Sequence, residues 1–229
     1  TRNDEKEIML GSGYSRTNLT VKTFHKVNDW LTIDLNTRLS DTYLKGAGTS
    51  SNSRLYHAIQ FHPVDGLMNF VDNNVTDEDF EATNSSIVNP VDQTNDDYSR
   101  QKDLAFYFNG AATIRFSKNL DYRFEYGVQY GESTDKRFYG INTTNVNLYG
   151  YQPIAAISKN DVNGYRLANI LTYTKRDFLP GNNISGMVGE ELNYSKSEVV
   201  SSSAKYFPMY IDAVTALSNM SLGTADPIM

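Results

Sequence analysis

A row of alternating charges in the middle of the chain is the strongest candidate for chemistry. Asp121, Arg123 and Glu125 stand two residues apart, and Arg115 precedes them across a short polar link. Two carboxylates beside a guanidinium could act as general acid and general base in an enzyme. The same spacing places all three on one face of a β-strand, where they could equally form a charged wall. Their role therefore depends on the elements that carry them.

Other residues that commonly carry catalysis or bind metals are sparse. The chain has no cysteine, which removes thiol nucleophiles and cysteine metal sites. His57 and His62 stand five residues apart, and two ligands share a helical face only when three or four apart. The acidic loop 77–81 lacks the residue order that wraps calcium. With no phosphate loop, nucleophile elbow or H-E-x-x-H pattern, we expect no catalytic residue, no cofactor, no metal site and no enzyme.

The composition limits the partners. The 229 residues carry 21 basic and 27 acidic side chains, a net charge of -6, which argues against a nucleic-acid partner. A mean hydropathy of -0.50 and the lack of any long apolar run exclude a membrane-spanning helix. A β-barrel needs no such run, because its strands show only every second side chain to lipid. The charged first residues show no signal peptide, as in a mature exported protein or an internal fragment.

Alternation with a period of two indicates β-strands. In segments 31–40, 104–116 and 120–130, apolar side chains alternate with polar or small ones, and a strand places each set on one face. Three further segments alternate less regularly, and Glu190 falls on the apolar side of the last, which predicts a β-bulge or a strand end there. The predicted strands lie near residues 14–26, 30–44, 103–117, 119–132, 164–175 and 183–196.

The connections between these strands alternate in length. Short turns are predicted near Asn28, Lys118 and Pro180, whereas the segments 45–102, 133–163 and 197–229 are long and polar. Short turns at one end and long loops at the other are typical of outer-membrane barrels. The predicted fold is therefore all-β: residues 1–229 form one antiparallel meander of about six long strands, part of a large transmembrane β-barrel with long extracellular loops.

The two faces of this sheet are expected to meet different surroundings. Tyr43, Tyr130, Tyr165 and Tyr173 fall at strand ends and fit the aromatic girdles of membrane interfaces. The side chains predicted to face lipid are Leu31, Ile33, Leu35, Phe106, Phe108, Phe124 and Tyr126. The predicted lumen-facing candidates for contact with a substrate are Asn36, Arg38, Tyr107, Asn109, Arg115, Arg123, Glu125 and Gln129.

Six short motifs, in order over nearly the whole chain, resemble the SusC/RagA type of TonB-dependent outer-membrane transporter. Each is weak alone, and their order and spacing are more specific than any one of them. They are VNDWLTIDLN at 27–36, NPV at 89–91, NLDYRFEYG at 119–127, LTYTK at 171–175, GEE at 189–191 and YFP at 206–208.

The resemblance implies a fragment of a barrel of about 22 strands. It further implies an N-terminal plug, energisation through TonB, a SusD-like lipoprotein lid, and uptake of an oligosaccharide or a peptide across the bacterial outer membrane, with no covalent chemistry. The plug and the TonB box are absent from this chain, so TonB contacts lie outside it. The motifs do not carry the family's substrate contacts.

A soluble cell-surface β-sandwich that binds a glycan through aromatic loops is the alternative. Strand length separates the two, because membrane strands need about 9–11 residues plus an overhang, whereas strands of globular proteins average about 5–6.

Overall fold

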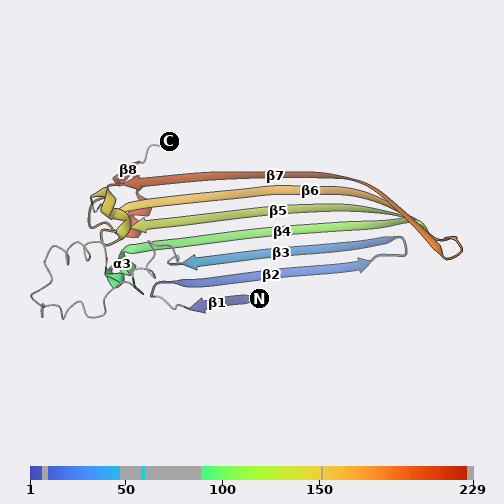
Figure 1. Ribbon diagram of the computed structural model, residues 1–229, viewed down its shortest axis with the longest axis horizontal. Coiled ribbons are helices and arrows are strands. Elements are labelled where there is room, and N and C mark those ends of the chain that lie inside the picture. Colours follow the sequence, from blue (N-terminus) through green and yellow to red (C-terminus); the bar gives the residue numbers. More distant parts are fainter. Residues whose placement is uncertain (7–9, 47–57, 60–88, 151, 226–229) are drawn as a thin grey trace, which may run out of the picture.

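The computed structural model describes residues 1–6, 10–46, 58–59, 89–150 and 152–225, and its strands form one antiparallel sheet. The strands of this described part follow one another across the sheet in chain order (Figure 1). They are β1 (Arg2–Lys6), β2 (Gly13–Lys26), β3 (Leu31–Lys45), β4 (Asp97–Ser117), β5 (Leu120–Tyr139), β6 (Ile154–Leu179), β7 (Asn182–Lys205) and β8 (Thr224–Ala225). The helical elements are α3 (Pro90–Asp96), η1 (Thr144–Tyr149), α4 (Ala213–Ser218) and η2 (Met220–Leu222).

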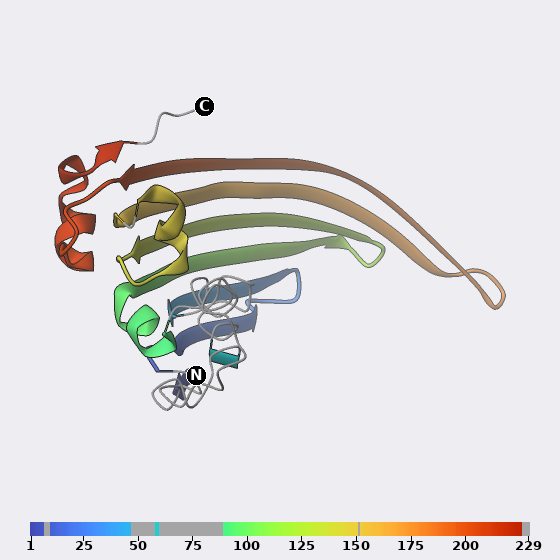
Figure 2. The same cartoon turned by 60° about the vertical axis from the view of Figure 1, so that its left-hand side comes forward.

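The three predicted short turns are confirmed, and they lie at one end of the sheet (Figure 1). In the β2–β3 turn the side-chain Oδ1 of Asn28 accepts hydrogen bonds from the backbone amides of Trp30 and Leu31, at 3.0 and 2.8 Å. In the β6–β7 turn Gly181 has φ 77°, a left-handed conformation that glycine adopts without a steric penalty. The described helices and the β7–β8 connection lie at the opposite end (Figure 1), and Figure 2 shows the same arrangement after a turn of 60°.

The strands extend further than the alternation predicted. Segment 133–163 is not one long loop, because β5 continues to Tyr139 and β6 begins at Ile154. The predicted loops 45–102 and 197–229 likewise lose their ends to β4 and β7. In these overhangs both faces carry polar side chains, so the alternation of apolar and polar residues disappears. The backbone pairing continues nevertheless, as in the pair Asp135↔Ser158. The short β1 and β8 were not predicted.

The register confirms that the sheet has two chemically different faces. Residues directly opposite one another in a ladder share a face, so pairs such as Leu39↔Phe106 and Tyr126↔Leu167 join into a continuous apolar surface. We call this the apolar face, and the opposite one, which carries Asn36, the polar face. All seven residues predicted to face lipid lie on the apolar face.

The bulge or strand end predicted at Glu190 is wrong, because Glu190 lies inside β7. Glu190 pairs in regular register with Asn169, whose Nδ2 donates to the Glu190 carboxylate at 3.0 Å. The hydroxyl of Tyr122 donates to Asn169 Oδ1 at 2.6 Å. Three polar groups on neighbouring strands thus satisfy one another, so the carboxylate needs no bulge to leave the apolar face.

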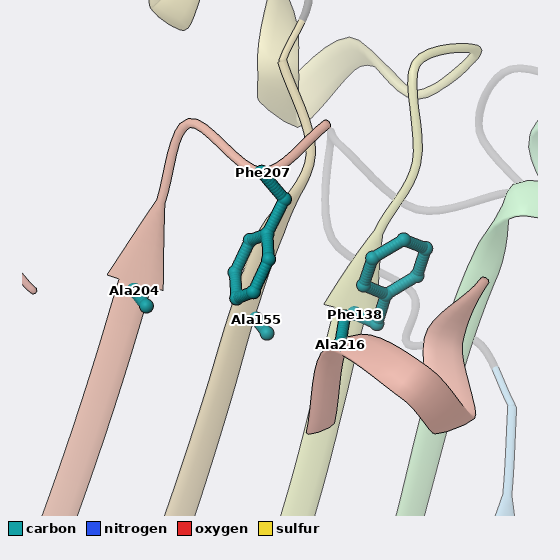
Figure 3. Close-up of a cluster of buried hydrophobic side chains, with 5 residues drawn as sticks. All are labelled: Phe138, Ala155, Ala204, Phe207 and Ala216. Atoms are coloured by element: carbon teal, nitrogen blue, oxygen red, sulfur yellow. The ribbon is translucent and has the colours of Figure 1, made fainter. Parts of the chain in front are cut away.

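A small hydrophobic cluster fastens the connections at the long-loop end. Phe138, Ala155 and Ala204 lie side by side on β5, β6 and β7, and Phe207 and Ala216 cover them (Figure 3). Asp212 is the N-cap of α4, and its carboxylate accepts hydrogen bonds from the backbone amides of Val214 and Thr215, both at 3.0 Å. We call this cluster together with α4 the cap. It packs on the apolar face, at the end of the sheet that carries the long loops.

The polar face as the candidate functional site

All eight predicted lumen-facing residues share the polar face. The register pairs Asn36 with Asn109 and Arg38 with Tyr107, and Tyr107 in turn with Gln129. On β4 and β5, Arg115 pairs with Asp121, and Arg123 and Glu125 occupy the next two positions of that face. Co-facial placement is what a wall requires. Whether these side chains contact a solute remains a prediction.

A hollow of about 570 Å³ lies over the middle of this face. It brings together four of the predicted residues, Asn36, Asn109, Arg123 and Glu125. The other four do not line it: Arg38, Tyr107 and Gln129 lie further toward the long-loop end and Arg115 toward the turns. The hollow also contains residues that were not predicted as candidates, namely Lys22, Asp34 and Arg166.

Charged side chains form a continuous chain of contacts across the hollow. Arg123 reaches the Asp34 carboxylate at 3.2 Å and Glu125 at 2.6 Å. Glu125 also accepts from Arg166 at 2.7 Å. Two nitrogens of Arg166 then bind both oxygens of Glu191 at 2.9 Å, a bidentate pair. One ion network therefore joins strands β3, β5, β6 and β7 on the polar face.

This network orders the wall more than it stabilises the fold. The Arg123 and Arg166 side chains remain 38% and 41% exposed, and ion pairs so accessible to water contribute about 0–1 kcal/mol each. Three carboxylates against two guanidiniums leave the network one unit negative, with Lys22 at its edge. Held in place by their neighbours, these groups form an ordered array of donors and acceptors on the polar face.

Glycines make room for two of the predicted amides. A Cβ on Gly127 would stand 2.7 Å from Asn109 Oδ1, and a Cβ on Gly164 would stand 2.8 Å from both Gln129 Nε2 and the Tyr194 carbonyl. Asn109 and Gln129 therefore lie flat against the neighbouring strand. In both cases the absence of a side chain on the glycine leaves space for the amide to lie close to the sheet.

Sequence reasoning missed Arg166 and Glu191, although the signal for both was present. Arg166 lies between Tyr165 and Leu167 of an alternating apolar set, and Glu191 directly precedes Leu192 of another. Asn169 and Glu190 interrupt the apolar alternation of these two strands, so the alternation does not mark the polar side on which Arg166 and Glu191 lie. Their register with Glu125 could not be inferred before the strand order was known.

On the apolar face, a band of large side chains crosses the sheet and ends in polar residues on both sides. It spans Leu104–Phe116 on β4, Leu120–Tyr130 on β5, and Ile184–Tyr194 on β7. Tyr165 and Tyr194 stack with ring centroids 5.3 Å apart at its edge toward the long loops. The band drifts: Leu104 is in register with Glu198, four residues beyond Tyr194, where the band ends on β7.

The described part of the chain contains no helix that is long and apolar enough to cross a membrane. The loop 77–81, considered above for calcium, lies outside the described residues, as do His57 and His62.

Comparisons with known proteins show the fold. No family model matches the sequence, and no curated protein matches it. A solved chain of the RagAB peptide transporter superposes with a TM-score of 0.58 at 13% identity, over 86% of this chain and 22% of that chain. Chains of the RagAB peptide importer match in its "open-open" state (TM-score 0.61, 13% identity, 95% and 24% coverage) and its "closed-closed" state (0.59, 12%, 94% and 24%). The chain thus spans about a quarter of the length of the structures it matches.

Proposed function

We propose that this chain forms part of the wall and outer loops of a TonB-dependent nutrient importer of the SusC/RagA type in the bacterial outer membrane. One observation carries the proposal. The same strands present a continuous apolar band on one face and an ordered ion network over a hollow on the other. A barrel wall between lipid and a water-filled passage needs this division.

In this role the polar face meets the cargo, which we propose to be a peptide or an oligosaccharide. Both carry many hydrogen-bonding groups, and a peptide adds terminal charges. The fixed carboxylates and guanidiniums around Arg166 can exchange contacts with such a solute without a large reorganisation. The chain contributes binding surface and no covalent chemistry.

The long-loop end is proposed to be extracellular, where a SusD-like lipoprotein lid would meet the barrel. The likeness to chains of a two-component peptide importer supports a lid partner for this chain. The TonB contacts and the plug belong to parts of the full-length protein outside residues 1–229.

The alternative of a soluble β-sandwich is not favoured. All strands of the described part belong to a single sheet, whereas a sandwich packs two sheets over a shared core. β4, β5, β6 and β7 have 21, 20, 26 and 24 residues, far above the length of about 5–6 residues common in globular proteins.

The test uses the full-length protein in its host, with Arg166→Gln as the variant and Arg2→Gln as the matched control. Arg166 bridges Glu125 and Glu191 on the polar face, whereas Arg2 pairs with Asp4 on the edge strand β1. We expect Arg166→Gln to reduce the uptake of labelled peptides or oligosaccharides severalfold at an unchanged outer-membrane level, and Arg2→Gln to leave uptake unchanged.

Testing both solute classes identifies the cargo. A full-length protein that fractionates away from the outer membrane would contradict the proposal. So would equal uptake by the wild type and the Arg166→Gln variant.

A further inference from the structure

The apolar face changes character abruptly beyond the Tyr165–Tyr194 pair. The next rows of the ladder place three carboxylates on adjacent strands, Glu132 opposite Asp161 and Asp161 opposite Glu198. Like charges directly opposite one another are destabilising. Lysines offset them: Lys159 lies 3.4 Å from both Glu132 and Asp161, and Lys196 lies 3.0 Å from Glu198.

Basic side chains occupy the rows that follow. Lys45 pairs with Arg100, and Arg100 with Lys136, so three cations lie next to one another in a single row across β3, β4 and β5. Lys102 and Lys159 lie in the row before it. We call these residues the cationic belt: Lys45, Arg100, Lys102, Lys136 and Lys159.

The belt is confined to one face. On the same stretches of β4 and β5, the polar face carries Asp97, Asp103 and Asp135, with Arg137 as its cation. The carboxylates Glu132 and Asp161 of the apolar side lie in the preceding row, and on β3 to β7 the two rows of the belt carry only cations and uncharged side chains. This local excess of positive charge favours an anionic partner on the apolar side.

Two members of the belt are available to such a partner. Lys102 and Lys136 are exposed, and neither side chain makes a hydrogen bond or ion pair with another residue in the described ranges. Lys45 lies over the ring of Tyr43 at 5.7 Å. Arg100 lies over the ring of Tyr98 at 4.6 Å and donates a hydrogen bond to the backbone carbonyl of Ser99 at 2.8 Å.

The belt also lies at a defined height. On β4, Lys102 lies one row beyond Leu104, where the apolar band ends, and on β6, Lys159 lies three rows beyond Tyr165. Phe138 of the cap lies one row beyond Lys136 on the other side. Tyrosines at the edge of such a band stand at the level of lipid headgroups. The cations beyond them would then stand where headgroup phosphates are.

We propose that the cationic belt binds the phosphate groups of lipid headgroups in the leaflet next to the long-loop end. This inference rests on the proposed membrane function and names a lipid partner for the outside of the same wall. Anionic lipid attracts lysine and arginine side chains close to the membrane surface, so the phosphates would offset the repulsion between neighbouring cations of the belt.

The experiment titrates the full-length protein in detergent with lipid A, a glycolipid with two phosphates, and with dephosphorylated lipid A, and counts bound lipid by native mass spectrometry. The variant is Lys102→Gln with Lys136→Gln. The control, Lys26→Gln with Lys118→Gln, removes the same charge at the turn end of the sheet. We expect the variant to lose about tenfold or more in apparent affinity for lipid A, and the control to bind like the wild type.

Dephosphorylated lipid A should bind all three proteins equally and weakly. Equal affinity of wild type and variant for lipid A overturns the proposal, as does an equal loss in variant and control. A variant loss that persists with the dephosphorylated lipid also overturns it, because the contact would not be with phosphate. A protein that fails to enter bilayers at all would instead contradict the proposed membrane function itself.

Discussion

At the residue scale, glycines opposite long polar side chains determine how closely those side chains lie against the polar face. Asn109 and Gln129 keep their places because the facing positions are Gly127 and Gly164. The two glycines differ in what an added methyl would meet. Near Gly127 it would meet the end of the Asn109 side chain, which can turn away. Near Gly164 it would also meet the backbone carbonyl of Tyr194, which cannot.

Gly164→Ala should therefore destabilise the sheet by about 1–3 kcal/mol, the usual cost of inserting a methyl where the backbone must move. Gly186→Ala on the neighbouring strand is the control, because nothing lies within 4 Å of its added Cβ. That change should be neutral or slightly stabilising, since alanine lowers the entropy of the unfolded chain. Unfolding of the full-length protein in denaturant measures both, and equal midpoints would contradict the steric argument.

At the element scale, the sequence predicted the strands wherever apolar side chains on one face alternate with polar side chains on the other. β2 through β7 were found because alternation reports a difference between two environments. In the overhang of β5 from Ser133 to Arg137 the side chains of both faces are polar, so the sequence shows no alternation there and predicts a loop. Ion partners such as Arg166 and Glu191 depend on register across strands, which a single sequence does not specify.

The cap is the element whose loss should separate local from global stability. Phe207 is fully buried in the cluster with Phe138, the strand residues Ala155 and Ala204, and Ala216 of α4. Phe207→Ala should cost about 3–5 kcal/mol of local stability, confined to the segment after β7. Limited proteolysis should then cleave between residues 206 and 223 well before the strands are cut.

Tyr210→Ala is the matched control for the cap, because that side chain is 91% exposed. It should leave the proteolysis pattern unchanged. If Phe207→Ala instead lowered the unfolding midpoint of the whole barrel, the cap would be part of the barrel's cooperative unit.

At the scale of the whole molecule, the two faces predict opposite responses to charge. Phe108→Arg places a cation in the middle of the apolar band and should cost about 2–4 kcal/mol when the full-length protein folds into lipid. Asn109→Arg, one residue along on the polar face, should cost little. The equilibrium for folding into lipid vesicles measures both, and equal costs would mean that the band does not face lipid.

The drift of the apolar band across the sheet has a geometrical consequence. Between β4 and β7 the edge of the band shifts by four residues relative to the register. At about 3.3 Å per residue and about 4.8 Å between strands, that is a climb of about 13 Å over about 14 Å, a slope of about 42°. Strands of closed membrane barrels are inclined by about 35–45° to the barrel axis. The stretch Leu120–Tyr130, about 33 Å along the strand, then projects to about 25 Å, the height of the apolar belt of such barrels. The shift of the band's edge from strand to strand therefore gives the strand inclination, and with it the shear, of the barrel that this sheet would close.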